Sequence, residues 1–328
     1  MSSPDPLAWR REGLVVTVAP GRDAWASHAQ SPVILPISDR LWRIYFSVRD
    51  ADNRARMAAV DVDPSAGMKV VDEHLEPMLA PATAGAFDHE GFGPGAVVVE
   101  EGRVWLYYSG VSVRRDVRFQ YAIGLAVSED GGLSFRRAAQ GPVIATGPRD
   151  PYFSSTPAVL RTAAGWRMWY TGGTGWREVD GVLDPFYEIR TAASQDGLTW
   201  TGSSTAVPTQ EPWIALTRPS PLAIAGGVRL WFCWRGRGYR DPAFSGEGYR
   251  LVWIDLDTNG IAVGQPTEVR FENPPASHEF DATAQAYPCI VPYGNDLIMV
   301  YNGDDFGARG FGWARLRGGA GPAGTGAS

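Results

Sequence analysis

Lysine and cysteine are both scarce in this chain. Lys69 is the single lysine among 30 basic residues, and the two cysteines are Cys233 and Cys289. Both cysteines lie in apolar runs and lack the spacing of zinc ligands, so the sequence predicts two reduced core thiols and no metal site. No run of 18 apolar residues is present, which argues against a membrane-spanning helix. The first residues lack the pattern of a secretory signal, and we therefore expect a cytoplasmic protein.

The sequence also has fewer basic than acidic residues and little helical periodicity. The 36 acidic residues outnumber the 30 basic ones, and a net charge of −6 argues against a nucleic-acid partner. No convincing amphipathic helix of a dozen residues is visible in the sequence. The chain is instead rich in aromatic residues (13 Trp, 12 Tyr, 13 Phe), in glycine (39) and in proline (25). This mixture favours short strands joined by many turns.

An internal repeat organises the sequence. Five segments begin with a proline that opens a short apolar run, at Pro32, Pro94, Pro157, Pro219 and Pro288. Thirteen or fourteen residues later, each segment places an aromatic residue inside a second apolar run, at Phe46, Tyr108, Tyr170, Phe232 and Tyr301. These aromatic residues are 62, 62, 62 and 69 positions apart. We call the five segments units one to five, and each is expected to open with a β-hairpin.

The repeat predicts the fold class. Third strands are expected at residues 56–61, 122–128, 189–194, 250–255 and 311–316, and Phe135, Trp200 and Val269 indicate fourth strands. Five units of three to four antiparallel strands predict an all-β protein, a five-bladed β-propeller, with a β-sandwich or a right-handed β-helix as the alternatives. Residues 13–317 would form this single domain, after an N-terminal extension (1–12) and before a disordered Gly/Ala-rich tail (318–328). Residues 14–18 are expected to pair with 311–316 and close the ring.

Loop lengths indicate which face carries the site. The connections after the second strands are long in units two to four, at residues 111–121, 173–187 and 235–249. In a propeller these loops share a face with the segments that lead into the next unit, and long loops often carry function. On the other face, residues 128–135 and 194–200 look like the Asp-box hairpins of sialidase-type propellers, for which we expect a structural role.

This hairpin rhythm resembles the arabinanase, levansucrase and invertase superfamily of five-bladed propellers, together with the related mannoside phosphorylases, over residues 13–317. Residues 28–32, 42–47, 87–94, 151–157 and 218–220 also resemble a group of bacterial proteins associated with surface-polysaccharide gene neighbourhoods. The resemblance implies a glycoside hydrolase-like enzyme with two or three carboxylates at the channel mouth and no cofactor. In arabinanase-type members a catalytic Asp directly precedes the opening proline. Here those positions are Ser31, Gly93, Thr156, Arg218 and Tyr287.

The candidate catalytic carboxylates therefore lie elsewhere. They are Asp88, Glu90, Asp150 and Asp281, with solvated turn residues as the alternative reading of each. His28, four residues before Pro32, is the non-carboxylate candidate because histidine titrates near neutral pH. Asp88 is the first choice as proton donor, since partial burial after Phe87 would raise its pKa.

Arginines and aromatic residues on the same face suggest the ligand. The candidate substrate-binding residues are Gln30, His89, Arg218, Tyr287, Trp176, Arg177, Arg235 and Tyr239. Guanidinium groups bind carboxylates and phosphates, although pairing with local acids is the alternative. The predicted function is glycoside hydrolase-like action on a phosphorylated or carboxylated sugar. The alternatives are a phosphorylase that uses inorganic phosphate and a non-hydrolytic sugar-binding or tailoring propeller. The partner is thus a small sugar or glycan.

Overall fold

The computed structural model describes residues 8–18, 25–162, 164–179, 181–209, 214–236 and 248–319. Within these ranges the regular elements are strands, two short 3₁₀ helices at Pro64–Ala66 and Asp304–Gly307, and no α-helix. The predicted all-β class is confirmed. The described part of the chain has no helix of sufficient length and hydrophobicity to cross a bilayer.

Units one and two form one eight-stranded sheet. Unit one contributes β2 (Ser27–Ser38), β3 (Leu41–Arg49), β4 (Ala55–Asp63) and β5 (Lys69–His74). Unit two contributes β6 (Gly91–Glu100), β7 (Arg103–Ser112), β8 (Gln120–Ser128) and β9 (Arg136–Arg137). A single parallel contact, Ala55 with Gly91, joins the two antiparallel sets.

Units three and four are separate four-stranded sheets, and unit five belongs to a five-stranded one. Unit three holds β10 (Ser154–Thr162), β11 (Gly165–Val179), β12 (Val182–Ser194) and β13 (Thr201–Val207). Unit four holds β14 (Ala215–Ile224), β15 (Gly227–Arg235), β16 (Tyr249–Leu256) and β17 (Ala262–Glu268). The last sheet combines β18 (Arg270–Phe271), β19 (Ala286–Tyr293), β20 (Asp296–Asn302), β21 (Gly310–Leu316) and β1 (Ala8–Thr17).

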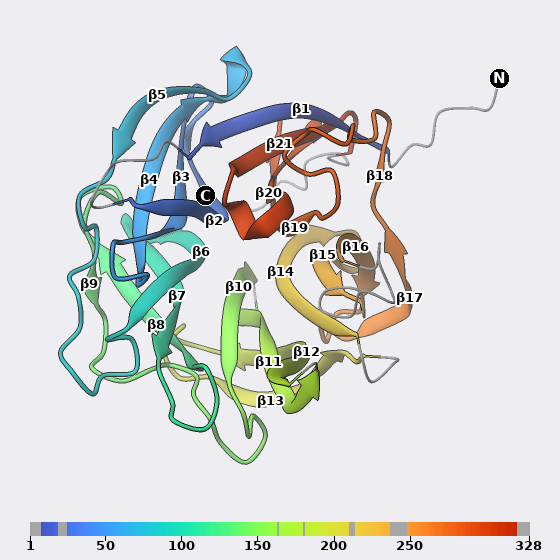
Figure 1. The fold of residues 1–328 in the computed structure, drawn as a ribbon. Helices are drawn as coiled ribbons and strands as arrows, with labels where there is room; N and C mark the ends of the chain where they lie inside the picture. The colour runs from blue at the N-terminus through green and yellow to red at the C-terminus, as the bar shows by residue number, and fades with distance from the viewer. Residues whose placement is uncertain are drawn as a thin grey trace.

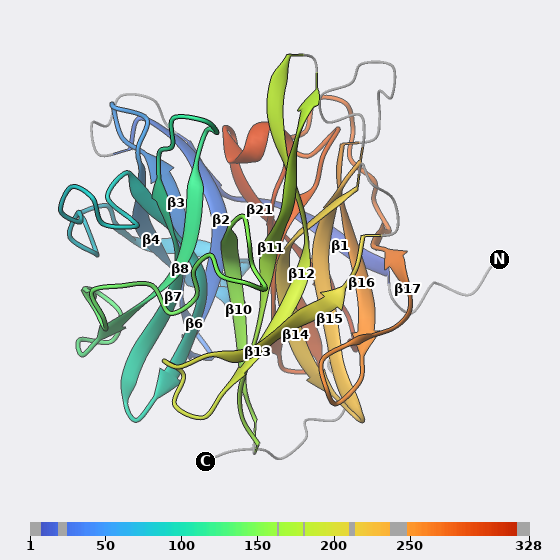
Figure 2. The same ribbon diagram turned by 90° about the horizontal axis from the view of Figure 1, so that it is seen from below.

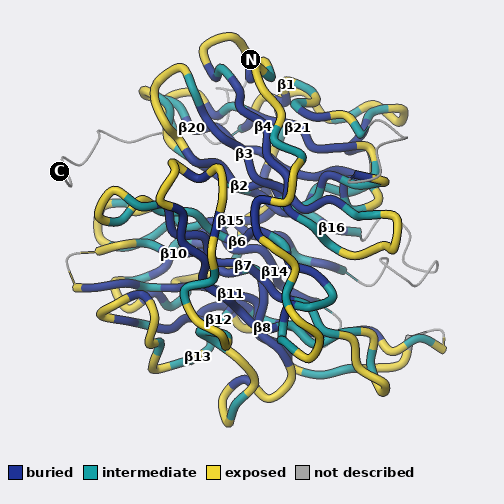
Figure 3. The backbone as a smooth tube through the Cα atoms, turned by 90° about the vertical axis from the view of Figure 1, so that its left-hand side faces the viewer, coloured by how far each residue is buried: buried dark blue, intermediate teal, exposed yellow. Residues whose placement is uncertain are grey.

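The first strand of every unit lies near the centre of the molecule (Figure 1). Each of these inner strands contacts the next, from β2 through β6, β10, β14 and β19 and back to β2. Figure 2 shows the same strands from the side, with connections gathered at both ends of the sheets. Figure 3 shows that the inner strands are largely buried and that the exposed residues lie mainly in the connections and at the strand ends.

Strand β1 joins the two ends of the described chain. It runs antiparallel to β21, from Arg10 opposite Arg315 to Thr17 opposite Gly310, with two bulges. The pairing includes the predicted partners Leu14 with Gly312 and Val16 with Phe311. The strand begins at Ala8, inside the segment predicted as an extension, because Trp9 is buried against Trp231 of unit four. Most of the predicted tail lies outside the described residues.

The core lies between neighbouring units rather than in one central mass. Trp105 of unit two stacks on Trp166 of unit three with ring centroids 5.5 Å apart. Trp42 of unit one meets Tyr293 of unit five edge-on at 5.3 Å. Buried aromatic residues at such joints contribute a large apolar area, which explains the abundance of tryptophan.

The two Asp-box hairpins connect units at the second face. Asp130 accepts hydrogen bonds from the backbone N–H groups of Leu133 and Ser134, which fixes the tight turn. The turn docks on the preceding unit, where the Tyr45 hydroxyl donates to the Gly132 carbonyl over 2.9 Å. Tyr107 donates to the Gly197 carbonyl in the same way. These contacts are structural, as the sequence predicted.

Candidate functional site

The residues that precede the opening prolines have a special backbone conformation. Ser31, Thr156, Arg218 and Tyr287 have φ values of 56°, 45°, 58° and 57°, in the left-handed region that L-residues rarely adopt. Each of the inner strands carries a register shift at this point. Strain of this kind costs on the order of 1–3 kcal/mol per residue and clusters at functional sites. The ends of the inner strands therefore form the candidate site.

The left-handed turn lets units one, three and four bond to the unit before them in the ring of contacts. The Thr156 N–H donates to the Ser109 hydroxyl of unit two over 2.7 Å. The Ser31 N–H donates to the Asn302 side-chain oxygen of unit five, also over 2.7 Å. Acceptors of this type follow the repeat aromatic residue in every unit, at Ser47, Ser109, Thr171, Cys233 and Asn302. These small polar residues explain how the strained conformation is held.

A ring of side chains, which we call the rim, surrounds these strand ends and includes residues from all five units. Its members are His28, Arg49, Tyr121, Phe153, Tyr187, Tyr249, Tyr287, Asp305 and Phe306. Phe153 lies 6.1 Å from both Tyr121 and Tyr187, measured between ring centroids. The hydroxyls of Tyr187 and Tyr249 are 2.8 Å apart. Tyr287 stacks on Phe306 at 6.3 Å.

His28 and Arg49 are neighbouring polar members of the rim. They belong to β2 and β3, where Ser27 pairs with Arg49. The Nδ1 atom of His28 lies 2.8 Å from the Ser27 hydroxyl. Burial and the Arg49 guanidinium lower the pKa of His28 below its ordinary value of 6.5, and the nearby Asp305 carboxylate opposes the shift. His28 is therefore a neutral base at pH 7, beside a cation.

Three of the predicted catalytic carboxylates are buried and hydrogen-bonded, and among their oxygens the Oδ1 atom of Asp88 is the one without a hydrogen-bond partner in the described part of the chain. Asp88 accepts hydrogen bonds from the Tyr108 hydroxyl at 2.9 Å and from Arg137 Nε at 2.8 Å. Asp150 accepts from the Tyr170 hydroxyl at 3.0 Å and forms an ion pair with Arg190 at 2.9 Å. Asp88 was predicted to be partly buried, and the structure shows it fully buried, with 1% of the residue exposed.

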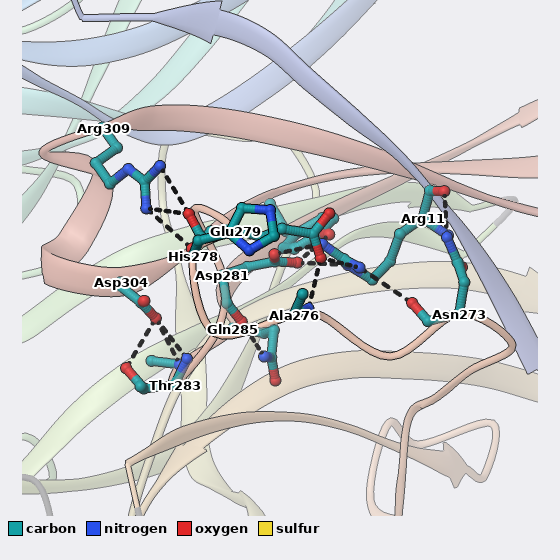
Figure 4. Close-up of polar contacts among 12 residues, drawn as sticks. Arg11, Asn273, Ala276, His278, Glu279, Asp281, Thr283, Gln285, Asp304 and Arg309 are labelled. Atoms are coloured by element: carbon teal, nitrogen blue, oxygen red, sulfur yellow. Dashed lines mark hydrogen bonds and ion pairs between the residues drawn. The ribbon is translucent and has the colours of Figure 1, made fainter.

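Asp281 repeats the arrangement in unit five (Figure 4). Its two carboxylate oxygens accept bonds from Arg11 Nε at 2.8 Å and Nη2 at 2.6 Å, and the Tyr301 hydroxyl donates at 2.6 Å. Arg11 also bonds Glu279 at 3.0 Å. Because Arg11 lies on β1, the carboxylate ties the N-terminal strand to the segment that leads into β19.

These three aspartates share a signature that is visible in the sequence. Each lies 20 positions before a repeat tyrosine that is followed two positions later by glycine, as in Tyr108-Ser109-Gly110. A Cβ on Gly110 would lie 2.6 Å from the Asp88 Cβ, so only glycine leaves room for the carboxylate. Units one and four have Phe46 and Phe232 instead, and neither carries the aspartate. The signature indicates an anchor for the incoming loop.

Glu90 and His89 form a local pair. His89 Nε2 lies 2.9 Å from Glu90 Oε1, and Arg54 Nε lies 3.4 Å from the other oxygen. Both side chains are partly exposed, at 29% and 26%. Among the described residues, neither member of this pair forms a hydrogen bond or ion pair with a rim side chain.

Arg218 lies at the centre of the inner strands, with 2% of its surface exposed. Its Nη1 donates to the Pro94 carbonyl at 2.9 Å, and its Nη2 donates to the carbonyls of Ser31 and Pro32 at 3.2 and 3.1 Å. The side chain therefore reaches from unit four to units one and two.

Two of the other predicted ligand-binding residues contact the rim, Trp176 against Phe153 at 6.1 Å and Arg235 over the Tyr187 ring at 5.1 Å. Trp176 packs on Phe119 at 5.1 Å, and Arg177 lies over the Phe186 ring at 4.8 Å. Arg235 pairs with Asp184 at 3.0 Å, as the alternative of local pairing anticipated. Gln30 pairs with Ser47 through the backbone of β2 and β3. Tyr239 lies outside the described residues.

Comparison with known proteins places the chain among relatives of the same length. No protein-family model matches it. Over 321 residues it is 34% identical to the uncharacterized proteins Rv1502 and MT1551 of two Mycobacterium tuberculosis strains, and the match covers 94% of this chain and 99% of theirs. This chain belongs to the Rv1502 family.

Solved structures show that this member of the Rv1502 family has the fold of propeller-type glycoside hydrolases. One match represents the GH130 family of mannoside phosphorylases, which contains glycoside hydrolases that target β-1,2-mannosidic linkages in Candida mannan. Its TM-score is 0.70 at 13% identity, covering 98% of this chain and 97% of the other. An endo-arabinase from Bacteroides thetaiotaomicron aligns with a TM-score of 0.59 at 11% identity, covering 92% and 96%.

Sequence reasoning missed several rim residues of this Rv1502 relative. Arg49, Tyr121, Tyr249, Asp305 and Phe306 were not among the candidates. Asp305 and Phe306 have left-handed φ values of 52° and 56°, a conformation that the flanking Gly303 and Gly307 could have suggested. Arg49 ends the second strand of unit one, a position that only the fold brings next to His28.

Proposed function

We propose that the chain is a carbohydrate-active enzyme of the glycoside hydrolase type that acts on a phosphorylated sugar at the rim. The observation that carries the proposal is the combination of aromatic side chains from several units with one neutral base and one cation, His28 and Arg49. Aromatic faces pack on the apolar faces of sugar rings, and a guanidinium binds phosphate through paired hydrogen bonds.

Five blades closed by β1 are part of the same proposal. The 62-residue spacing, the contacts of each inner strand with the next, and the bond from Ser31 to Asn302 between units one and five support it. The domain would then comprise the predicted residues 13–317 together with the beginning of β1. We also propose a cytoplasmic location, which the two free thiols of Cys233 and Cys289 support.

The proposed reaction is hydrolysis of the bond between the anomeric carbon and a phosphate oxygen. His28 accepts a proton from water, the water oxygen bonds to the anomeric carbon, and the phosphate leaves with the bonding electron pair. A phosphate is a stable leaving group without protonation, so this reaction needs no carboxylic acid beside the leaving oxygen. Arg49 balances the phosphate charge. The bonds from Tyr108, Tyr170 and Tyr301 to Asp88, Asp150 and Asp281 are compatible with this chemistry, in which the three aspartates hold the framework.

The test uses the full chain with a panel of hexose 1-phosphates and neutral aryl glycosides. We expect equal release of inorganic phosphate and reducing sugar. His28→Gln should lower kcat about 10²–10⁴-fold, the usual contribution of a general base. His278→Gln is the matched control, because His278 is exposed in the segment before β19. Cleavage of the neutral glycosides at the same rate by the wild type and by His28→Gln would refute the proposal.

Two other outcomes identify the alternatives. Consumption of an aryl glycoside only when inorganic phosphate is added would indicate a phosphorylase. Sugar binding without turnover would indicate a non-hydrolytic binding or tailoring protein, which the absence of a carboxylate before each opening proline favours.

A further inference from the structure

A cavity of about 110 Å³ lies among the inner strands. Residues from β2, β6, β10, β14 and β19 line it, so it is surrounded by all five units. Most of the lining is aliphatic or proline, and the polar side chains that line it are those of Arg218, Ser220 and Cys289. None of the lining residues is a carboxylate. The space is several times the volume that one ordered water needs.

The charge of Arg218 is not neutralised by the described part of the protein. Its three hydrogen-bond acceptors are backbone carbonyls, which supply dipoles but no net negative charge. No acidic side chain in the described ranges forms an ion pair with it. Burial lowers the pKa of Arg218, which shows the cost of holding this cation away from water. A buried guanidinium normally has a counter-charge.

Ser220 and Cys289, the other two polar side chains of the lining, each have a hydrogen-bond donor that is not used in the described contacts. The Ser220 hydroxyl oxygen accepts from the Ile290 N–H at 2.9 Å, which leaves its own O–H available. The Cys289 sulfur accepts from the Ile34 N–H at 3.4 Å, which leaves its S–H available. Both side chains are bonded at their acceptor atoms, and no carboxylate lines the cavity to receive their remaining hydrogens.

We propose that this cavity binds one small monovalent inorganic anion of the halide type, held by Arg218 and Ser220. A single cation and one or two neutral donors match one negative charge. A phosphate or sulfate has four oxygens and up to two charges and would leave several oxygens unbonded against aliphatic walls. A cation would meet Arg218 directly. The inference is independent of the sugar chemistry at the rim.

The test compares salts at constant ionic strength, so that screening of surface charges is the same. The thermal midpoint of the full chain should rise with sodium bromide concentration and reach saturation, and it should not rise with sodium gluconate, whose anion is too large for the cavity. Arg218→Met should abolish the bromide-specific rise. Arg229→Met, which removes an arginine from a partly exposed pair with Asp255, should retain it.

Two further measurements test the anion site even if Arg218→Met does not fold. Ser220→Ala should require about tenfold more bromide for the same rise in midpoint, the effect of losing one hydrogen bond to a charged group. Crystals grown in bromide should show an anomalous peak within hydrogen-bond distance of Arg218 and Ser220. Equal midpoints in bromide and gluconate, or a bromide crystal without a peak in this cavity, would overturn it.

Discussion

Tyr301 donates its hydroxyl hydrogen to Asp281 across 2.6 Å, and the same aspartate holds Arg11 of the N-terminal strand. The contact joins three segments that are distant in the sequence: the end of β20, the loop before β19, and β1. Loss of one partner from such a buried pair leaves an uncompensated charge or an unsatisfied donor.

We therefore expect Asp281→Asn to lower the free energy of unfolding by about 3–5 kcal/mol, as measured by urea denaturation. Asp255→Asn is the control, because the Asp255 side chain is 40% exposed beside Arg229 and its pair should contribute about 0–1 kcal/mol. Similar denaturation midpoints for the two variants would contradict the anchoring role.

Asp88→Asn separates the catalytic interpretation from the structural one. The sequence predicts a loss of kcat for this variant, whereas the bonds from Tyr108 and Arg137 predict a loss of stability. We expect kcat, measured well below the unfolding temperature, to stay near the wild-type value while the urea midpoint falls. A 10²-fold loss of kcat in a variant of unchanged stability would restore Asp88 as the proton donor.

The pH dependence of kcat/KM, which reports the titrating groups of the free enzyme, should identify His28 as the base. Its pKa is lowered below 6.5 by burial and by Arg49, so the base form prevails at pH 7 and activity should decline as the pH falls through the lowered pKa. The unfolded chain would bind more protons than the folded one in this range, so the free energy of unfolding should decline in the same direction. The acid limb should be missing in His28→Gln. An acid limb above pH 6.5 would contradict the assignment.

The two ends of the chain should differ in their importance for stability. Removal of residues 1–18 takes away β1 with its pairing to β21 and the Arg11–Asp281 contact, and should lower the thermal midpoint sharply. Removal of residues 320–328 should have almost no effect, since β21 ends at Leu316. Scanning calorimetry of the two truncated chains decides the matter, and equal midpoints would argue against a role for β1.

The thiols should be unreactive in the folded protein. Burial raises the pKa of Cys233 to about 12 and also raises that of Cys289, so both remain mainly protonated thiols at pH 8. We expect no labelling by a disulfide reagent in native buffer and labelling of both cysteines in guanidinium chloride. Rapid modification of a native thiol would show that the inner strands open readily.

The repeat made the strand order predictable, because period and turn chemistry are local properties of the chain. Third strands predicted at residues 122–128 and 250–255 lie within β8 and β16. The predicted fourth strand near Val269 instead falls between β17 and β18. Strand ends depend on contacts between units, which the repeat does not specify.

The roles of the carboxylates were less accessible from the sequence. The spacing of 20 residues between Asp88 and Tyr108 could be read directly, but the arginine partners lie 49 residues away for Asp88 and 270 for Asp281. Only the packed fold decides whether a loop aspartate faces solvent or a buried guanidinium. The rim was hard to predict for the same reason, because Asp305 lies near His28 in space but at the other end of the sequence.

The pairing of β1 with β21 also sets an order of events during synthesis. The first strand to leave the ribosome cannot find its partner until Gly310–Leu316 has been translated. At about 5–20 residues per second this delay lasts on the order of 15–60 s. Throughout that time the β1 segment lacks its partner β21, and its unpaired backbone groups can pair with another nascent chain. The arginines at positions 10 and 11 give this waiting strand a positive charge that opposes association with its own copies.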